Sequence, residues 1–395
     1  MTTILKFAGF IAAILVLWFG THYLLYVSFV RLFIITDPGT RKTILWILLF
    51  LALSFFISAF LLHLHVRNPF TETLYLIAAV WLGLFLYLLM ALILIGLIFG
   101  VGKLVGFVPD MRMVAAGFFL LAAAVSVYGI WCAQNPSVKQ IEVKIEGLPE
   151  QWRNKKIIQL SDVHLGAIYG TGFMQRVADK VNREKPDLIL ITGDLFDGMG
   201  GRLSSFIEPL NALKASGGVF FVTGNHEGYL GLKEPLAVLG KTHIRVLDNE
   251  IIDLDGLQIV GIRYPEHDHL NNTRNLLTQP GSYDAGKPSI LMYHTPTNIE
   301  ETYSDRASQQ SRTYWHPDTS MALAKEVGID LQLSGHTHKG QLFPFMFQTR
   351  SVYKGFDYGL HRDGGFQVYI SSGVGTWGPP MRIGVPSEIV SILLR

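Results

Sequence analysis

The stretch Asp187-Leu188-Ile189-Leu190-Ile191-Thr192-Gly193-Asp194-Leu195-Phe196-Asp197 decides the fold of this 395-residue chain. Its first six residues are almost entirely apolar, which predicts a short strand buried on both faces, as in a parallel sheet covered by helices. The run stops at Gly193-Asp194, so a carboxylate stands where the strand ends. Functional groups gather at the carboxyl ends of strands in α/β sheets. The stretch therefore predicts an α/β fold with a polar site at one edge of a sheet.

Two neighbouring segments repeat this arrangement. The predicted strand Lys156–Leu160 leads to Ser161-Asp162-Val163-His164, and the predicted strand Gly218–Thr223 leads to Gly224-Asn225-His226-Glu227. Between the first two strands, apolar residues recur at helical spacing over Met174–Val181. The resulting β-α-β-α-β order is typical of a crossover sheet. We therefore expect the three polar segments to meet at the same sheet edge.

Two more polar segments follow later strands. Ser289–Tyr293 leads to His294, and Ile329–Leu333 leads to Ser334-Gly335-His336-Thr337-His338. The other predicted elements are strands near Ile141–Ile145, Leu257–Ile262, Phe366–Ser371 and Glu388–Leu393, helices near Ser204–Ala215 and Ser320–Val327, and loops over Tyr264–Pro280 and Glu301–Asp318.

Carboxylate, amide and imidazole groups delivered by five strand ends suit a pair of hard to borderline divalent cations. Each segment alone is weak evidence, since an Asp-x-His at a strand end is usually a turn and Gly-Asn is a common turn signal. Their occurrence at five strand ends in one chain is what favours a metal site. Asp197 and Glu227 remain open, as either functional groups or solvated turn carboxylates.

Taken together and in this order, the five segments resemble the calcineurin-like metallophosphoesterase superfamily over residues 139–395. The strings at residues 334–338 and 373–382, the second of which begins Gly373-Val374-Gly375 and ends at Arg382, resemble its membrane-associated YkuE-type branch. The resemblance implies a four-layer αββα sandwich of two mixed sheets. It also implies metal-dependent hydrolysis of a phosphomonoester or phosphodiester by a metal-bridging hydroxide.

The resemblance further implies a role for each site residue. His226 would stabilise the transition state or protonate the leaving group, and Asp197 would orient a ligand or the turn. Lys339 stands where this branch often has glycine, and it either contacts a substrate phosphate or points to solvent. The cofactors would be two divalent ions, with Mn, Fe and Zn all suited to the donor set. The implied ligands are Asp162, His164 and His338 for one ion, Asn225, His294 and His336 for the other, and Asp194 as the bridge.

The first third of the chain has a different composition. Charged residues make up only 16% of the whole sequence, and the deficit lies before residue 135. Four apolar segments of about 20 residues or more are each long enough to cross a hydrocarbon core about 30 Å thick. We therefore predict a membrane domain at residues 1–135 and a catalytic domain at residues 136–395. The predicted spans are Ile4–Val30, Thr43–Leu62, Thr73–Val101 and Met113–Ala133.

The loop charges favour one orientation of these spans. Five Lys and Arg residues flank one side and four flank the other. The richer side faces the cytoplasm under the positive-inside rule, so we expect an integral protein of a bacterial cell membrane with its catalytic domain outside the cytoplasm. The five are Arg31, Arg41, Lys42, Lys103 and Arg112, and the four are Lys6, Arg67, Lys139 and Lys144.

The expected partners are a phosphoester substrate and the membrane. A net charge of +2 gives no argument for nucleic acid, and the single cysteine, Cys132, allows no disulfide within the chain. The apolar segment Leu342–Phe347 closely follows His338, and it either contacts lipid, which would favour a lipid-linked substrate, or packs into the core. Two alternatives remain open: a lipid-linked pyrophosphatase, and an inert membrane scaffold or sensor. The sequence leaves the oligomeric state undetermined.

Overall fold

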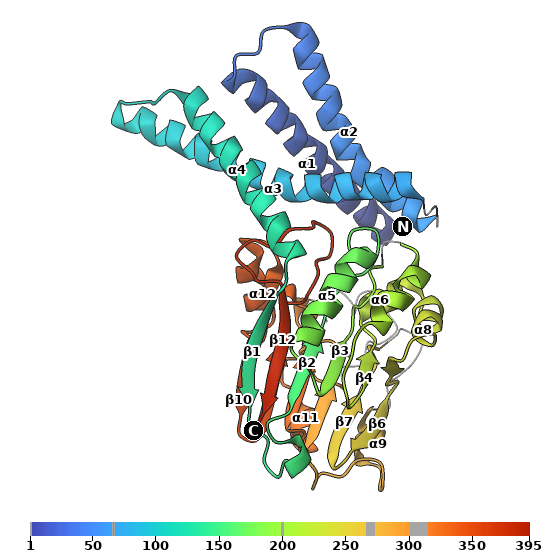
Figure 1. The fold of residues 1–395 in the computed structure, drawn as a ribbon. Coiled ribbons are helices and arrows are strands. Elements are labelled where there is room, and N and C mark those ends of the chain that lie inside the picture. The colour runs from blue at the N-terminus through green and yellow to red at the C-terminus, as the bar shows by residue number, and fades with distance from the viewer. Residues whose placement is uncertain (1, 65, 67, 199–200, 266–272, 301–314) are drawn as a thin grey trace. The chain divides into compact units, whose positions relative to one another are not determined.

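A computed structural model describes residues 2–64, 66, 68–198, 201–265, 273–300 and 315–395 of the chain (Figure 1). The chain divides into two compact units. One comprises residues 1–130 with 378–381, and the other comprises residues 131–377 with 382–395. Most of the predicted loop Glu301–Asp318 lies outside the described residues.

The first unit is built from long helices, and four helices of the described chain are long and apolar enough to cross a membrane. The sequence predicted four such segments, and the structure confirms that each is a helix of sufficient length. Polar caps explain where two of them begin: the Asp37 side chain accepts from the Thr40 N–H, and the Asn68 side chain accepts from the Thr71 N–H. The helices are α1 (Thr2–Leu32), α2 (Pro38–His63), α3 (Pro69–Val105) and α4 (Met111–Gln134).

A buried histidine joins two helices of this unit. The indole N–H of Trp81 in α3 donates to His22 Nε2 in α1 at 3.1 Å, and His22 Nδ1 lies 2.8 Å from the carbonyl oxygen of Trp18. The imidazole also stacks on Phe85, with 3.9 Å between ring centroids. Because both ring nitrogens have partners, His22 is accounted for as a packing residue of the helix pair.

The second unit contains two six-stranded sheets (Figure 1). The first has the order β1-β12-β2-β3-β4-β5, and only the β12–β2 pair is antiparallel. The second has the order β10-β11-β9-β8-β7-β6, with antiparallel pairs at its two edges. The strands are β1 (Ser137–Val143), β2 (Lys156–Leu160), β3 (Leu188–Thr192), β4 (Val219–Val222), β5 (Arg245–Val246), β6 (Glu250–Leu254), β7 (Leu257–Gly261), β8 (Ser289–Met292), β9 (Leu331–Ser334), β10 (Gly359–Asp363), β11 (Phe366–Ile370) and β12 (Glu388–Leu394).

Apolar clusters lie on both faces of each sheet and hold the layers of the domain together. In β3, Leu188 and Leu190 belong to the cluster between the two sheets, while Ile189 and Ile191 belong to the cluster under the helices. A third cluster covers the outer face of the second sheet. The two mixed sheets with helices outside them confirm the predicted αββα arrangement. The helices of this unit are α5 (Thr171–Arg183), α6 (Ile207–Asn211), α7 (Asn225–Leu230), α8 (Lys233–Leu239), α9 (Thr273–Thr278), α11 (Ala322–Glu326) and α12 (Phe345–Val352), with 3₁₀ turns η1 (Glu150–Trp152), η2 (Leu203–Phe206) and η3 (His338–Gly340).

Some sequence predictions about individual elements were wrong. The helix expected near Ser204–Ala215 is the short pair η2 and α6. Pro209 lies within it and has no N–H to continue the helical ladder. The predicted loop Tyr264–Pro280 contains the helix α9. The elements β5, β6, β10 and α12 were not predicted, because each is either short or mostly exposed and carries little apolar periodicity.

Candidate metal centre

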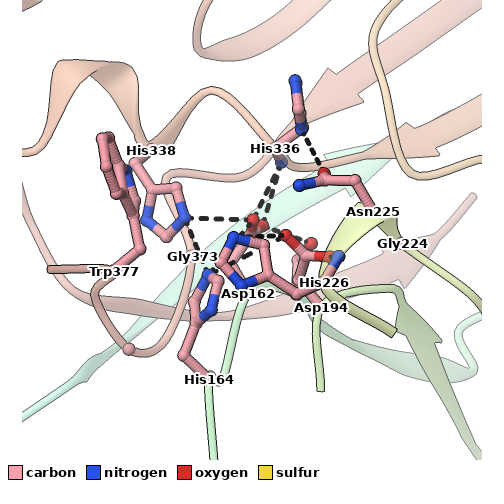
Figure 2. Close-up of polar contacts among 12 residues, drawn as sticks. Asp162, His164, Asp194, Gly224, Asn225, His226, His336, His338, Gly373 and Trp377 are labelled. Carbon is pink, nitrogen blue, oxygen red and sulfur yellow. Dashed lines mark hydrogen bonds and ion pairs between the residues drawn. The ribbon is translucent and has the colours of Figure 1, made fainter. Parts of the chain in front are cut away.

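Both sheets contribute side chains to one cluster, which Figure 2 shows at close range. Every candidate ligand stands just after a strand, at its carboxyl end, as the sequence predicted. Because β2, β3 and β4 run parallel in one sheet and β8 and β9 run parallel in the other, their ends converge. The first sheet supplies Asp162 and His164 after β2, Asp194 and Asp197 after β3, and Asn225 and His226 after β4, and the second supplies His294 after β8 and His336 and His338 after β9.

Asp162, His164 and His338 form one group of donors. The Nε2 atoms of the two histidines lie 3.0 Å apart. His338 Nε2 is 3.2 Å from Asp162 Oδ1, and His164 Nε2 is 4.0 Å from the same oxygen. All three side chains are almost completely buried. Two imidazole nitrogens and a carboxylate therefore point at one another inside the protein.

A second group contains Asp194, His294 and His336, with Asn225 beside them. His294 Nε2 lies 3.2 Å from Asp194 Oδ2. The Asn225 carbonyl oxygen is 3.2 Å from His294 Nε2 and 2.9 Å from His336 Nδ1. Four donor atoms from β3, β4, β8 and β9 thus converge, and the amide oxygen takes part as an acceptor.

Asp194 belongs to a further group, with His164 and His226. Its Oδ2 atom lies 3.9 Å from His164 Nε2 and 4.0 Å from His226 Nε2. Asp194 therefore stands between the first group and the second, in the position that a shared carboxylate would need (Figure 2). Nitrogen and carboxylate oxygen donors that converge in this way suit Mn, Fe or Zn ions.

The electrostatics keep the two carboxylates and His336 in the protonation states that metal ligands need, whereas His294 holds a proton that it would have to lose to bind an ion. Burial alone would raise the pKa of Asp162 and of Asp194, but the neighbouring histidines outweigh it and hold both pKa values below the usual range. Burial lowers the pKa of His336 to about 3, with the charge of His294 adding to the shift. At His294 burial is opposed by the charge of Asp194, which raises the pKa of His294 to about 9.

The backbone at the site is strained. Non-glycine residues rarely adopt positive φ angles, and such conformations cluster at functional sites. Most of the candidate ligands have them, and they all lie within turns that leave a strand. The angles are 52° at Asp162, 53° at His164, 51° at Asp194, 72° at His336 and 47° at His338.

Two glycines permit the close approach of the strand ends. A Cβ atom at Gly224 would collide with the Asp194 carboxylate, and one at Gly335 would collide with Ser161 Oγ and Asp162 Oδ2. Both glycines stand in the motifs, one residue before Asn225 and one before His336. Glycine at these positions therefore lets the loops pack against the two carboxylates.

His226 lies at the rim of the cluster and is held by Asp197. Its Nδ1 atom is 3.4 Å from Asp197 Oδ1 and 3.2 Å from the Gly198 nitrogen. Burial opposes a charged ring here, but Asp194 and Asp197 outweigh it and raise the pKa of His226 to about 9. Asp197 is 4% exposed, so it is not a solvated turn residue.

Glu227 is also buried, which answers the question that the sequence left open. Its Oε2 atom accepts from the N–H groups of Asp194 at 3.0 Å and Gly224 at 2.7 Å, and Oε1 accepts from the Phe196 N–H at 3.0 Å. Burial raises the pKa of Glu227 to about 7, with the charge of Asp194 adding to the shift. This carboxylate ties the turn after β3 to the turn after β4. Its position three residues after Gly224, as in a capping box, was the available sequence signal.

Arg382 is a site residue whose role the sequence analysis missed. It is 1% exposed, and its guanidinium donates to the carbonyl oxygens of Gly373, Gly375 and His338. Its Nη2 atom also lies 3.2 Å from His338 Nδ1. The loop from Gly373 to Gly375 is hydrogen-bonded to the turn after β2, since the Gly375 N–H donates to the Asp162 carbonyl at 2.8 Å. Arg382 thus braces one side of the first donor group.

Lys339 is half-buried and lies against an aromatic ring. Its Nζ atom is 4.1 Å from the ring centroid of Tyr358, and Lys139 Nζ is 4.2 Å from the same centroid. The Tyr358 hydroxyl donates to the buried carboxylate of Glu388 at 2.9 Å. Two ammonium groups therefore lie against the Tyr358 ring, and its hydroxyl binds the Glu388 carboxylate.

The family model for calcineurin-like phosphoesterases matches residues 155–340. An uncharacterized metallophosphoesterase of Helicobacter pylori is 31% identical over 302 residues, which cover 73% of this chain and 74% of that protein. The chain belongs to the calcineurin-like phosphoesterase family.

Two further relatives carry metallophosphoesterase names. A Danio rerio protein named transmembrane protein with metallophosphoesterase domain is 33% identical, over 80% of this chain and 72% of that protein. The metallophosphoesterase YkuE of Bacillus subtilis is 26% identical, over 64% of this chain and 83% of that protein. The relatives therefore include proteins whose names join a phosphoesterase domain to membrane spans.

Proposed function

We propose that this calcineurin-like phosphoesterase is a membrane-anchored hydrolase that uses two divalent metal ions to cleave a phosphomonoester or phosphodiester. The observation that carries the proposal is the position of Asp194, whose carboxylate belongs both to the group with His294 and His336 and to the group with His164 and His226. One carboxylate between two sets of imidazoles is the arrangement that a two-ion site requires.

The proposed ligands follow the donor groups. Asn225, His294 and His336 would hold one ion, and Asp162, His164 and His338 the other, with Asp194 reaching both. Bound ions would supply activation of water and neutralisation of phosphate charge. The protein itself supplies a buried pocket wall with fixed dipoles, because the turns are tied together by Glu227 and Arg382.

His226 is proposed to act on the substrate. It is the most exposed imidazole of the group that includes His164 and Asp194, with its side chain 15% exposed. Asp197 holds its Nδ1 side, so Nε2 is the atom that would donate a proton to a phosphate oxygen or to the leaving oxygen. Asp197 would then act by orienting His226.

The short connection between the apolar helix α4 and the catalytic domain favours a lipid-linked phosphoester as the substrate. Only Asn135 and Pro136 separate α4 from β1. Ser137 begins β1 opposite Glu388, and the Glu388 N–H donates to the Gly373 carbonyl, beside Asp162. The chain thus enters the catalytic domain at the end that carries the donor groups.

The test is hydrolysis by the purified full-length chain in detergent or nanodiscs. After chelation and return of Mn²⁺, Fe²⁺ or Zn²⁺, we expect metal-dependent turnover of aryl phosphomonoesters or phosphodiesters and about two bound ions per chain. Asp194→Asn should abolish turnover, whereas the exposed Asp179→Asn should not. Turnover confined to lipid diphosphates would favour the pyrophosphatase alternative. Bound metal without turnover on any substrate would favour an inert scaffold and contradict the proposal.

A further inference from the structure

Four exposed aromatic side chains lie next to the first donor group. Phe343 is 40% exposed, Phe345 42%, Phe347 64% and Trp377 56%. Phe343 and Phe347 are within 6.0 Å of each other by ring centroid. We call this set the aromatic rim. The sequence allowed these phenylalanines to pack into the core, and the structure shows that the three side chains remain accessible.

Hydrogen bonds fix the rim to the donor groups. Gln341, three residues after His338, donates to the Trp377 carbonyl at 3.0 Å and accepts from the Trp377 N–H at 3.1 Å. The loop that leads to Trp377 is bonded to the end of β2, with Val374 N donating to the Ser161 carbonyl at 2.9 Å. The rim is therefore a rigid border of the site.

The short helix α12, which carries Phe345 and Phe347, has no buried residue. A helix in a soluble unit normally buries one apolar face. Its polar residue Gln348 is exposed as well, Arg350 lies in its last turn, and Lys354 follows its end. Phenylalanine and tryptophan beside basic residues are the composition of segments that lie in the interface of a bilayer.

The point where the chain leaves the apolar helix α4 indicates what binds the aromatic rim. Strand β1 starts at Ser137, three residues after the last residue of the apolar helix α4. It runs away from the donor groups because it is parallel to β12 and β12 is antiparallel to β2. The rim and the point where the chain enters the domain therefore share one end of the sheets. Glu146, beyond the carboxyl end of β1, lies at the other end.

We propose that the aromatic rim docks on the bilayer, at the boundary between headgroups and acyl chains, and holds the donor groups against the lipid surface. The proposal goes beyond the hydrolysis proposed above, since docking requires no turnover. A second copy of the chain bound to the rim is the competing occupant.

The test uses the full chain in nanodiscs of phosphatidylcholine and phosphatidylglycerol. Cys132 is the only cysteine, so a Cys132→Ala background accepts a single environment-sensitive fluorophore at Phe345→Cys, at Phe347→Cys or, as the matched control, at Glu146→Cys. We expect a blue shift at both rim positions, and loss of emission with lipids that carry a nitroxide near the headgroup. The Glu146 probe should show neither change.

The proposal is overturned if the rim probes respond like the probe at Glu146. A blue shift without nitroxide quenching also overturns it, because the rim would then be covered by protein. Energy transfer between labelled chains placed in one nanodisc would identify that protein as a second copy. The fluorescence measurement does not depend on turnover. A protein without hydrolytic activity whose rim probes are quenched would therefore contradict the proposed hydrolysis but support docking.

Discussion

The backbone N–H of Asp194 donates to the buried carboxylate of Glu227 at 3.0 Å. The same carboxylate accepts from Gly224 and Phe196, so one side chain satisfies three N–H groups of two turns. Glu227→Gln replaces one acceptor oxygen by an amide that only donates, and at least one N–H is left facing a donor. We expect a loss of about 2 kcal/mol of stability and reduced metal content. Thermal unfolding and metal analysis would measure both, with the exposed Glu208→Gln as control. Unchanged stability and metal content would contradict the bracing role.

His226→Ala separates catalysis from metal binding. If His226 acts on the phosphate, the variant should keep its ions and lose about 10²- to 10⁴-fold in turnover. Metal content per chain, measured beside kcat, provides the comparison, and His243→Ala on the exposed surface is the control. A variant with near-normal turnover, or one that has lost its metal, would show that the assignment is wrong.

Arg382→Met removes the brace beside His338. The Gly375 carbonyl oxygen would lose its guanidinium donor while remaining buried. The carbonyls of Gly373 and His338 would keep the N–H groups of Glu388 and Gln341. Leaving one buried acceptor unpaired costs about 1–3 kcal/mol, so we expect a loss of that size and weaker metal binding. Thermal unfolding at several metal concentrations would measure it against the exposed Arg183→Met. Equal stability of the two variants would contradict the prediction.

The rim also predicts a selective effect on substrates. Phe345→Ser with Phe347→Ser should lower hydrolysis of a lipid phosphoester in vesicles and spare a small soluble phosphoester, since neither residue belongs to a donor group. The ratio of the two rates is the measurement. Equal losses on both substrates would point to damage of the fold and remove this support for a lipid substrate.

The orientation of the membrane spans is predicted from the flanking Lys and Arg residues, five on one side and four on the other. The bias places the domain of residues 136–395 outside the cytoplasm. Paired reporters fused after Arg395 would decide it in a bacterial host: an exported phosphatase should be active there and a cytoplasmic fluorescent protein dark. The reverse pattern would reverse the orientation.

The sequence predicted the strands of the site well because each is a short apolar run buried on both faces. Lys156–Leu160 was predicted with the bounds that β2 has in the structure, and Asp187–Thr192 differs from β3 by one residue. Parallel pairing of β2 and β3 then brings Asp162 and Asp194 to one sheet edge, and the packing of the second sheet on the first adds His294. The coordination roles of these residues stay predictions until metal binding is measured.

What the sequence could not predict depends on contacts between distant segments. Arg382 lies 44 residues from His338, and nothing local shows that its guanidinium is buried against three carbonyl groups. The helix α12 buries no residue, so it has no apolar stripe from which a helix could be predicted. Glu227 was ambiguous because a turn carboxylate and a buried brace have the same local sequence.

The left-handed backbone at Asp162, His164, Asp194, His336 and His338 has a consequence for metal exchange. Each such residue costs on the order of 1–3 kcal/mol, which the surrounding sheets must offset whether or not an ion is bound. The turns are thus shaped in advance by the rest of the domain. We therefore expect ions to leave and return without local unfolding, so that the species loaded in the cell is set by the supply of free metal.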